Sequence, residues 1–218
     1  MLKIESIWIK TIINQIEINQ NSYILNFGSQ SQKTLKYQPY IHYNVIAELQ
    51  KKGAKIINFD IKEGEGIDIS GNIYDYEVFE RLKKYNFSYI FLFNVMEHVK
   101  EINEFCYRIQ NLVKVNNMII VTVPYDFPYH FDPIDNGLRP NVSELVKYFP
   151  NLIMIYGETI TDYKYTYYLV HYWHITVRFI FRIFTPFYKF NTWKKTIITK
   201  IPYLFKPFKV TCVVLQKR

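Results

Sequence analysis

Polar side chains that could bind a ligand or move a proton follow two apolar runs of this sequence. Asn94 and Glu97 come directly after the run 89–93, and His130 lies in a polar loop that follows the run 118–123. Short apolar runs rich in β-branched and aromatic residues, separated by a helical segment, predict buried parallel strands of a βαβ unit. Ligands bind outside the carboxyl ends of such strands. We therefore expect these polar residues at the binding edge of a sheet.

Two further strand ends favour a nucleoside site. Gly28 closes the predicted strand 23–27, and Asp60 closes the predicted strand 54–59. Glycine lets the backbone approach a ligand closely, and a carboxylate about one βαβ unit onward can accept hydrogen bonds from ribose hydroxyls. No second or third glycine follows Gly28, so the pyrophosphate fingerprint is absent and a dinucleotide is disfavoured.

The elements that must position these residues alternate between strand and helix. Predicted helices occupy residues 1–20, 43–52, 76–85 and 141–148, and predicted strands occupy 23–27, 54–59, 67–69, 89–93, 118–123, 152–156 and 209–216. This alternation predicts an α/β, Rossmann-like sheet, seven-stranded and mostly parallel, with helices on both faces. No linker separates a second domain, so we expect a single domain over 1–218 with a helical lead-in at 1–20.

Charge is distributed unevenly along the chain. The net charge of +8 arises from −1 over residues 1–150 and +9 over residues 151–218. Such asymmetry indicates an anionic partner, either a membrane surface or nucleic acid. Cys106 and Cys212 have no metal or redox spacing, which favours packed thiols in a reducing cytosol. Charged residues interrupt the N-terminal apolar stretch, so no signal peptide is expected.

The ordered set of motifs resembles the class I S-adenosylmethionine-dependent methyltransferases, most closely the branch found in bacterial surface-polysaccharide biosynthesis. The resemblance covers residues 21–156 and the final strand. Its matching segments are 25–29, 56–60, 68–73, 94–99, 123–125 and, most specific for that branch, 128–140, which contains histidine, aspartate and arginine.

This resemblance implies S-adenosylmethionine as cofactor and assigns roles to named residues. The implied cofactor contacts are Asn26, Phe27, Gly28, Ser29, Asp60, Ile61, Asn72, Ile73, Asn94, Val95 and Glu97. The implied substrate contacts are His98, Asp132 and Arg139, and the implied catalytic residues are His130 and Asp135; no metal is implied. Asn26 and Asn72 stand where acids are commoner in the family, and Gln30 where a further glycine often stands. A catalytically silent relative therefore remains an alternative.

Several of these residues have a second interpretation. His130 could be a general base, because a neutral imidazole near pH 7 can remove a hydroxyl proton, or a loop histidine held by Asp132 or Asp135. Arg139 could pair with Asp135 or hold a carboxylate or phosphate of the acceptor. Glu97 could simply favour a helix start.

The segment 157–208 differs in composition from the rest of the chain. Twelve of the 28 residues in 163–190 are aromatic, and no acid follows Asp162. Histidine and arginine interrupt the run, which disfavours a transmembrane helix. The segment could roof the substrate cleft, or residues 163–209 could lie on an anionic membrane.

The leading hypothesis is methyl transfer to an oxygen or nitrogen of a small-molecule or glycan-related acceptor by a cytoplasmic enzyme, peripheral to the inner face of the membrane if the basic aromatic segment binds lipid. A second hypothesis is a non-catalytic protein of the same fold that docks on membranes or partner enzymes. A nucleic-acid methyltransferase is a weaker third, because no compact basic recognition motif is present.

Overall fold

The protein is built on one mixed sheet. The computed structural model describes residues 1–29, 38–129, 134–185, 187 and 190–218. Within these residues the sheet has seven strands in the order β3-β2-β1-β4-β5-β7-β6. They are β1 (Tyr23–Phe27), β2 (Lys55–Asp60), β3 (Ile69–Ser70), β4 (Phe87–Phe93), β5 (Met118–Asp126), β6 (Leu152–Lys164) and β7 (Pro207–Lys217). β7 runs antiparallel to both of its neighbours and the other pairs are parallel, which confirms the predicted mostly parallel sheet.

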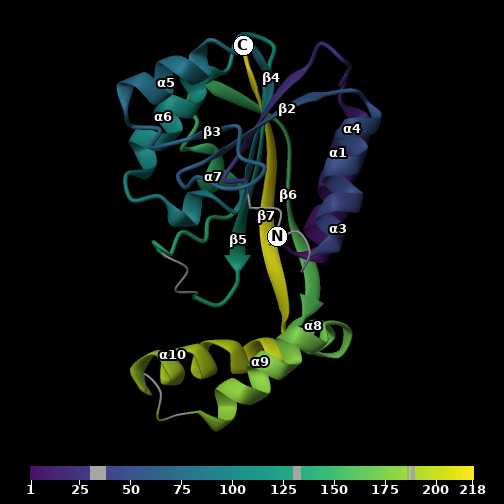
Figure 1. Ribbon diagram of the computed structural model, residues 1–218, viewed down its shortest axis with the longest axis vertical. Coiled ribbons are helices and arrows are strands. Elements are labelled where there is room, and N and C mark those ends of the chain that lie inside the picture. The colour runs from purple at the N-terminus through teal and green to yellow at the C-terminus, as the bar shows by residue number, and fades with distance from the viewer. Residues whose placement is uncertain (30–37, 130–133, 186, 188–189) are drawn as a thin grey trace.

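Helices cover both faces of the sheet (Figure 1). One face carries α1 (Lys3–Gln15), α3 (Pro39–Ile41), the π-helix η1 (His42–Ile46) and α4 (Ala47–Lys51). The other carries α5 (Tyr76–Lys83), α6 (Ile102–Leu112) and α7 (Val142–Val146). The sheet between them is apolar on both sides: Ile90 and Leu92 of β4 belong to one core cluster and Phe91 to the other. This two-sided burial explains why β4 has a continuous apolar run rather than an alternating one.

The helix predicted over 43–52 begins earlier and is less regular than expected. It starts at Pro39, whose fixed φ suits the first helical position, and passes through the π-helical turn η1 before α4. The short strand predicted over 67–69 is displaced to Ile69–Ser70. The position of β3 is set by pairing with the end of β2, where Asp60 lies opposite Ser70.

The strand predicted over 152–156 extends further than expected, into the segment 157–208 whose composition is aromatic and basic. Residues 157–164 continue β6, because β6 and β7 stay paired from Leu152 opposite Lys217 to Lys164 opposite Pro207. The sequence did not indicate this extension, because most residues in the second half of this edge strand are polar and exposed rather than apolar and buried. What remains is helical: α8 (Tyr165–His171), α9 (Trp173–Phe184), α10 (Phe190–Lys200) and the 3-10 helix η3 (Ile201–Leu204).

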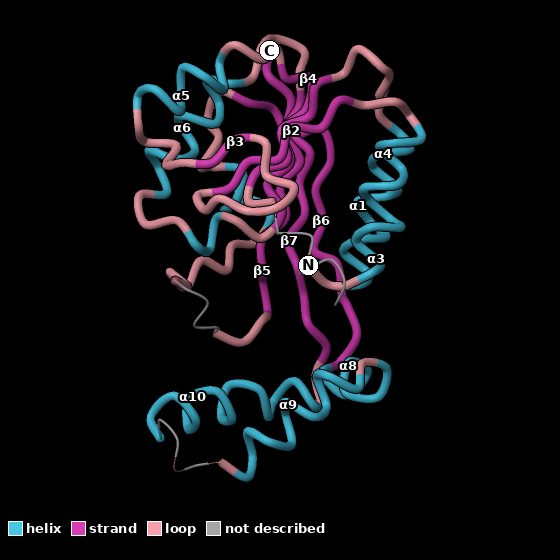
Figure 2. The backbone as a smooth tube through the Cα atoms, viewed as in Figure 1, coloured by secondary structure: helices cyan, strands magenta, loops and turns pink. Residues whose placement is uncertain are grey.

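These helices form a layer beyond the end of the sheet, where β6 and β7 extend past the other strands (Figures 1 and 2). A small aromatic cluster of Tyr168, Tyr203 and Phe208 joins the layer to the sheet. Among the described residues, no helix combines the length and apolar character needed to cross a bilayer.

Candidate active site

The carboxyl ends of β1 and β2 are tied together at Gly28. Its backbone has a φ of +72°, and its N–H donates to the Phe59 carbonyl at 2.8 Å. A Cβ at this position would lie 2.7 Å from Cγ2 of Val95, which follows β4. Ser29 is buried and its hydroxyl also donates to the Phe59 carbonyl. Glycine is therefore required both by the left-handed backbone and by the close approach of the turn after β4.

Asp60 ends β2 with a carboxylate that reaches solvent. One carboxylate oxygen accepts the Lys62 N–H at 3.0 Å, and the Asp60 carbonyl accepts the Gly71 N–H at 3.1 Å. These contacts hold the following turn and leave acceptor capacity on the carboxylate. Asn72 lies exposed in the next turn, where its side-chain oxygen accepts the Tyr74 N–H. The end of β2 thus presents polar acceptors beside the loop after β3.

Four other predicted cofactor residues differ in their accessibility. The Asn26 amide donates to Oδ1 of Asn58 on the neighbouring strand at 2.9 Å. The Phe27 ring is buried against Phe59, with ring centroids 4.6 Å apart. Ile61 is exposed, whereas Ile73 is buried. The buried Phe27 and Ile73 side chains are parts of the core, so they shape this edge from beneath.

The turn after β4 is set by Asn94, which has a φ of +54°. Its N–H donates to the Thr122 carbonyl at 2.9 Å, and its side-chain amide donates to a Glu5 carboxylate oxygen at 2.7 Å. Asparagine tolerates this left-handed conformation better than most residues. The chain then enters the 3-10 helix η2 (Met96–His98), which buries Glu97.

Glu5 is a functional candidate that the sequence analysis did not identify. It lies in the first turn of α1 with a fully buried side chain. Its carboxylate accepts hydrogen bonds from Oγ1 of Thr122 at 2.6 Å, from the Asn94 amide at 2.7 Å and from the Leu2 N–H at 2.8 Å. The signal was present, since Glu5 shares the buried face of α1 with Trp8 and Ile9. Glu5 fastens α1 to the ends of β4 and β5.

Replacing Glu5 with alanine is expected to lower the free energy of unfolding by about 2–4 kcal/mol, because the buried Thr122 hydroxyl and the half-buried Asn94 amide each lose their acceptor. Chemical denaturation measures this loss. Glu17→Ala, which changes an exposed glutamate shortly after α1, serves as the control and should change stability little. A Glu5→Ala protein as stable as the wild type would show that the contact to Asn94 and Thr122 does not fasten α1.

Glu97 has the least satisfied carboxyl group at this edge. Its side chain is 1% exposed, and its Oε2 atom has no hydrogen-bond partner among the described residues. Its Oε1 lies 3.9 Å from Nε2 of His98. Burial, reinforced by the negative charge of Glu5, raises the pKa of Glu97 to about 8. At neutral pH Glu97 is therefore mainly a neutral acid that can donate a hydrogen bond as well as accept one.

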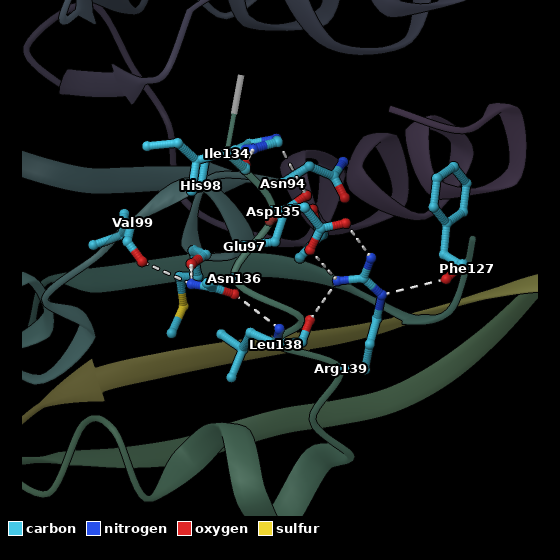
Figure 3. Close-up of polar contacts among 12 residues, drawn as sticks. Asn94, Glu97, His98, Val99, Phe127, Ile134, Asp135, Asn136, Leu138 and Arg139 are labelled. Carbon is cyan, nitrogen blue, oxygen red and sulfur yellow. Dashed lines mark hydrogen bonds and ion pairs between the residues drawn. The ribbon is translucent and has the colours of Figure 1, made fainter. Parts of the chain in front are cut away.

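The segment 134–139 lies against η2 and is hydrogen-bonded to it (Figure 3). The Asn136 N–H donates to the Glu97 carbonyl, and its side-chain amide donates to the carbonyls of Met96 and Val99. Nδ1 of His98 donates to the Ile134 carbonyl. Asn136 thus holds the loop against the turn after β4, a role that no local pattern in the sequence indicated.

Asp135 and Arg139 form a two-point ion pair within this segment. The guanidinium donates to the two Asp135 oxygens at 2.6 and 3.1 Å, and its Nε donates to the Phe127 carbonyl at 3.4 Å (Figure 3). The Asp135 side chain is fully buried, and the Gly137 N–H donates to it as well. Pairing was one of the two interpretations of Arg139, and the structure contains that pair.

The predicted site residues are therefore brought to one edge in two groups. Gly28, Ser29 and Asp60 lie at the ends of β1 and β2, while Asn94, Val95, Glu97 and His98 follow β4. Val95 approaches Gly28, and Glu97 and His98 contact the segment 134–139. His130 and Asp132 lie outside the residues that the structure describes.

Comparison with known proteins places this fold. No family model and no curated protein matches the sequence. Among solved structures, the chain is similar to a protein from Galdieria sulphuraria described as a sarcosine dimethylglycine methyltransferase, with a TM-score of 0.61, 11% identity, and coverage of 98% of this chain and 84% of that one. It is also similar to a coclaurine N-methyltransferase bound to N-methylheliamine and SAH, with a TM-score of 0.57, 10% identity, and coverage of 99% and 72%.

A cyclopropane synthase from Mycobacterium tuberculosis is similar to the same degree, with a TM-score of 0.57, 9% identity, and coverage of 96% and 83%. The chain thus has the Rossmann-like fold of the class I S-adenosylmethionine-dependent methyltransferases, with an antiparallel hairpin at one end of the sheet. Because these structures share a fold and differ in reaction, the reaction of this chain must be argued from its site.

Proposed function

We propose that this protein transfers the methyl group of S-adenosylmethionine to a small-molecule acceptor. The observation that carries the proposal is the convergence of Gly28, Asp60 and the Asn94–Glu97 turn at the carboxyl ends of three adjacent strands. In open α/β sheets this edge is where ligands bind. The fold similarity to methyltransferases agrees with this choice of cofactor.

The residues at this edge fit a nucleoside cofactor that also carries an amino acid. Asp60 has acceptor capacity for ribose hydroxyls, and Asn72 and the exposed Ile61 flank the next loop. Glu97 lies buried beneath this edge, and its Oε2 has no hydrogen-bond partner among the described residues. When bound, the cofactor supplies an activated methyl group on a cationic sulfur. The protein then contributes mainly by holding the acceptor in attack geometry.

The acceptor that we propose is glycan-related, from surface-polysaccharide biosynthesis. This finer assignment is supported by the similarity of the segment 128–140 to that branch of the family. If the acceptor atom is a hydroxyl oxygen, His130 acts as the general base that removes its proton. Asp132 and His98 then contact the acceptor, while Asp135 and Arg139 keep the loop in position through their ion pair.

Calorimetry with S-adenosylmethionine and with its demethylated product tests the proposal. Both are expected to bind, and Asp60→Ala should weaken binding by about 1–3 kcal/mol because polar groups lose their partner. Asp75→Ala is the matched control: Asp75 is exposed before α5 and makes no side-chain cap hydrogen bond.

The results separate three interpretations. Absence of binding of both compounds at millimolar concentration would favour the non-catalytic alternative. Binding that Asp60→Ala leaves unchanged would remove Asp60 from the ribose site and keep the cofactor. Methyl transfer to a sugar-containing acceptor, but not to RNA or DNA, would support the glycan-related assignment over a nucleic-acid methyltransferase.

A further inference from the structure

One face of α9 is an apolar stripe that faces solvent. Large apolar side chains at helical spacing are exposed along it, namely Trp173 (77%), Val177 (55%), Ile180 (49%), Phe181 (67%) and Phe184 (76%). Among the described residues, α9 buries no side chain. The opposite face makes the contacts to the protein, since Ile175 packs on the aromatic cluster and Phe179 meets the ring of Tyr165. The helix α9 therefore has apolar residues on both faces, one toward the protein and one toward solvent.

The second helix of the layer and the connection before it also expose large apolar side chains. Phe190 and Ile198 of α10 are each 56% exposed, and Phe187, between the two helices, is 96% exposed. The helices are linked where the Trp193 indole donates to the Arg182 carbonyl at 2.5 Å. We call this region, residues 173–185, 187 and 190–201, the α9–α10 hairpin. Monomeric soluble proteins rarely expose a contiguous apolar stripe such as that of α9 without a partner.

The charge around the hairpin has one sign. No Asp or Glu occurs after Asp162, whereas 11 Lys and Arg residues lie between 164 and 218. Arg178, Arg182 and Lys194 are exposed on the hairpin. Burial, and then the nearby charge of Arg182, lowers the pKa of Lys200. This local excess of positive charge is complementary to an anionic partner and repels a second copy of the same face.

We infer that the α9–α10 hairpin binds flat on an anionic lipid bilayer, with its apolar stripe in the headgroup boundary and its cations on lipid phosphates. Aromatic and aliphatic residues on one face with basic residues beside them are the features of interfacial helices. A nucleic acid would bind the cations but leave the exposed Phe and Ile side chains in water. An anionic bilayer binds the cations through its phosphates and buries the apolar side chains at its surface.

This orientation also turns the candidate active site toward the membrane. β5 and β6 run toward the helical layer, so the carboxyl ends of the parallel strands face the side on which the hairpin lies (Figure 1). An acceptor anchored in lipid would reach the site from that side. This extension rests on the proposed function, whereas the docking itself does not.

Co-sedimentation of the full chain with vesicles tests the docking. Phosphatidylcholine vesicles containing phosphatidylglycerol should bind the protein at low salt, pure phosphatidylcholine vesicles should bind much less, and salt should weaken the binding. Trp173 and Trp193 both lie in the hairpin, so tryptophan fluorescence should shift to the blue on binding. Trp173→Phe should reduce that shift, because Trp173 is the more exposed of the two. An absence of binding to the anionic vesicles at low salt would overturn the inference.

Two pairs of variants separate the apolar and charged contributions. Phe181→Ser with Phe184→Ser should reduce vesicle binding at least tenfold, whereas Tyr43→Ser with Tyr76→Ser, equally exposed on the body, should leave it unchanged. Arg182→Gln with Lys194→Gln should reduce it roughly 30-fold, at about 1 kcal/mol per basic residue. Arg81→Gln with Lys84→Gln, exposed on α5 and after it, is the charge control.

Light scattering in the absence of vesicles tests whether the exposed face of α9 instead binds a second copy of the protein. A concentration-dependent dimer that Phe181→Ser with Phe184→Ser converts to a monomer would assign the face to a second copy and overturn the inference. A monomer that binds anionic vesicles supports it. Because none of these measurements uses S-adenosylmethionine, failure of the docking is distinguishable from failure of the proposed function.

Discussion

Replacing Arg139 with methionine is expected to lower the free energy of unfolding by about 3–5 kcal/mol. The Asp135 carboxylate is fully buried and receives two hydrogen bonds from the guanidinium, so the variant leaves a buried charge without its counter-ion. Methionine keeps most of the apolar volume of the side chain, which confines the change to charge and hydrogen bonding. Urea unfolding of the two proteins measures the difference.

Two further variants identify the cause of that loss. Lys83→Met removes an exposed ion pair to Glu80 and should cost less than about 1 kcal/mol. Adding Asp135→Asn to Arg139→Met removes the carboxylate charge that Arg139 balances in the wild type and should recover part of the lost stability. If the double variant is no more stable than Arg139→Met alone, the effect arises from lost packing and the ion pair does not stabilise the loop.

The sheet could be predicted from the sequence because its central strands are buried on both faces. The runs around Leu25, Ile90 and Val121 contain almost no polar residue, and in the structure all three side chains are fully buried. β6 was predicted too short because its second half is an exposed edge. The second half of β6 is held by pairing with β7, about 50 residues further along the chain. Such long-range pairing cannot be recognised from the residues near 160 alone.

The candidate site was predictable where it depends on strand ends and unpredictable where it depends on long-range contacts. Gly28, Asp60 and Asn94 could be found because each follows an apolar run. Glu5 meets Thr122 across 117 positions, and a lone acid on an apolar helix face does not reveal its partners. Asn136 was missed for the same reason, since its partners are backbone carbonyls of the turn after β4.

The hairpin shows a different limit of the sequence. Aromatic and basic composition indicated either a roof over the cleft or a membrane surface, and composition alone could not separate them. The structure divides the segment: Tyr168 and Tyr203 are buried against Phe208, whereas the α9 stripe faces solvent. Which aromatic residues are buried depends on where β6 and β7 end, and that is a property of the sheet rather than of the segment itself.

Glu97 makes the stability of the folded protein depend on pH. Burial raises its pKa in the folded protein to about 8, from the usual 4.5. Between these two values the unfolded chain releases the proton and the folded protein keeps it, so the stability gained from the neutral form is complete below pH 4.5 and is lost as pH rises to about 8. The loss is about 1.4 kcal/mol per pH unit, or roughly 5 kcal/mol in total.

Glu97→Gln isolates this effect, because glutamine resembles the protonated acid and does not titrate. The variant should gain stability relative to the wild type as pH rises from 5 to 8, and the difference should level off above pH 8. Thermal unfolding of both proteins at several pH values measures the difference, in which the other titrating groups, such as the buried Asp162, largely cancel. Glu77→Gln, at an exposed position in α5, should show a constant difference. If the Glu97→Gln difference is equally constant, Glu97 is ionised in the folded protein at neutral pH, and its unpartnered oxygen must then be paired with a cation.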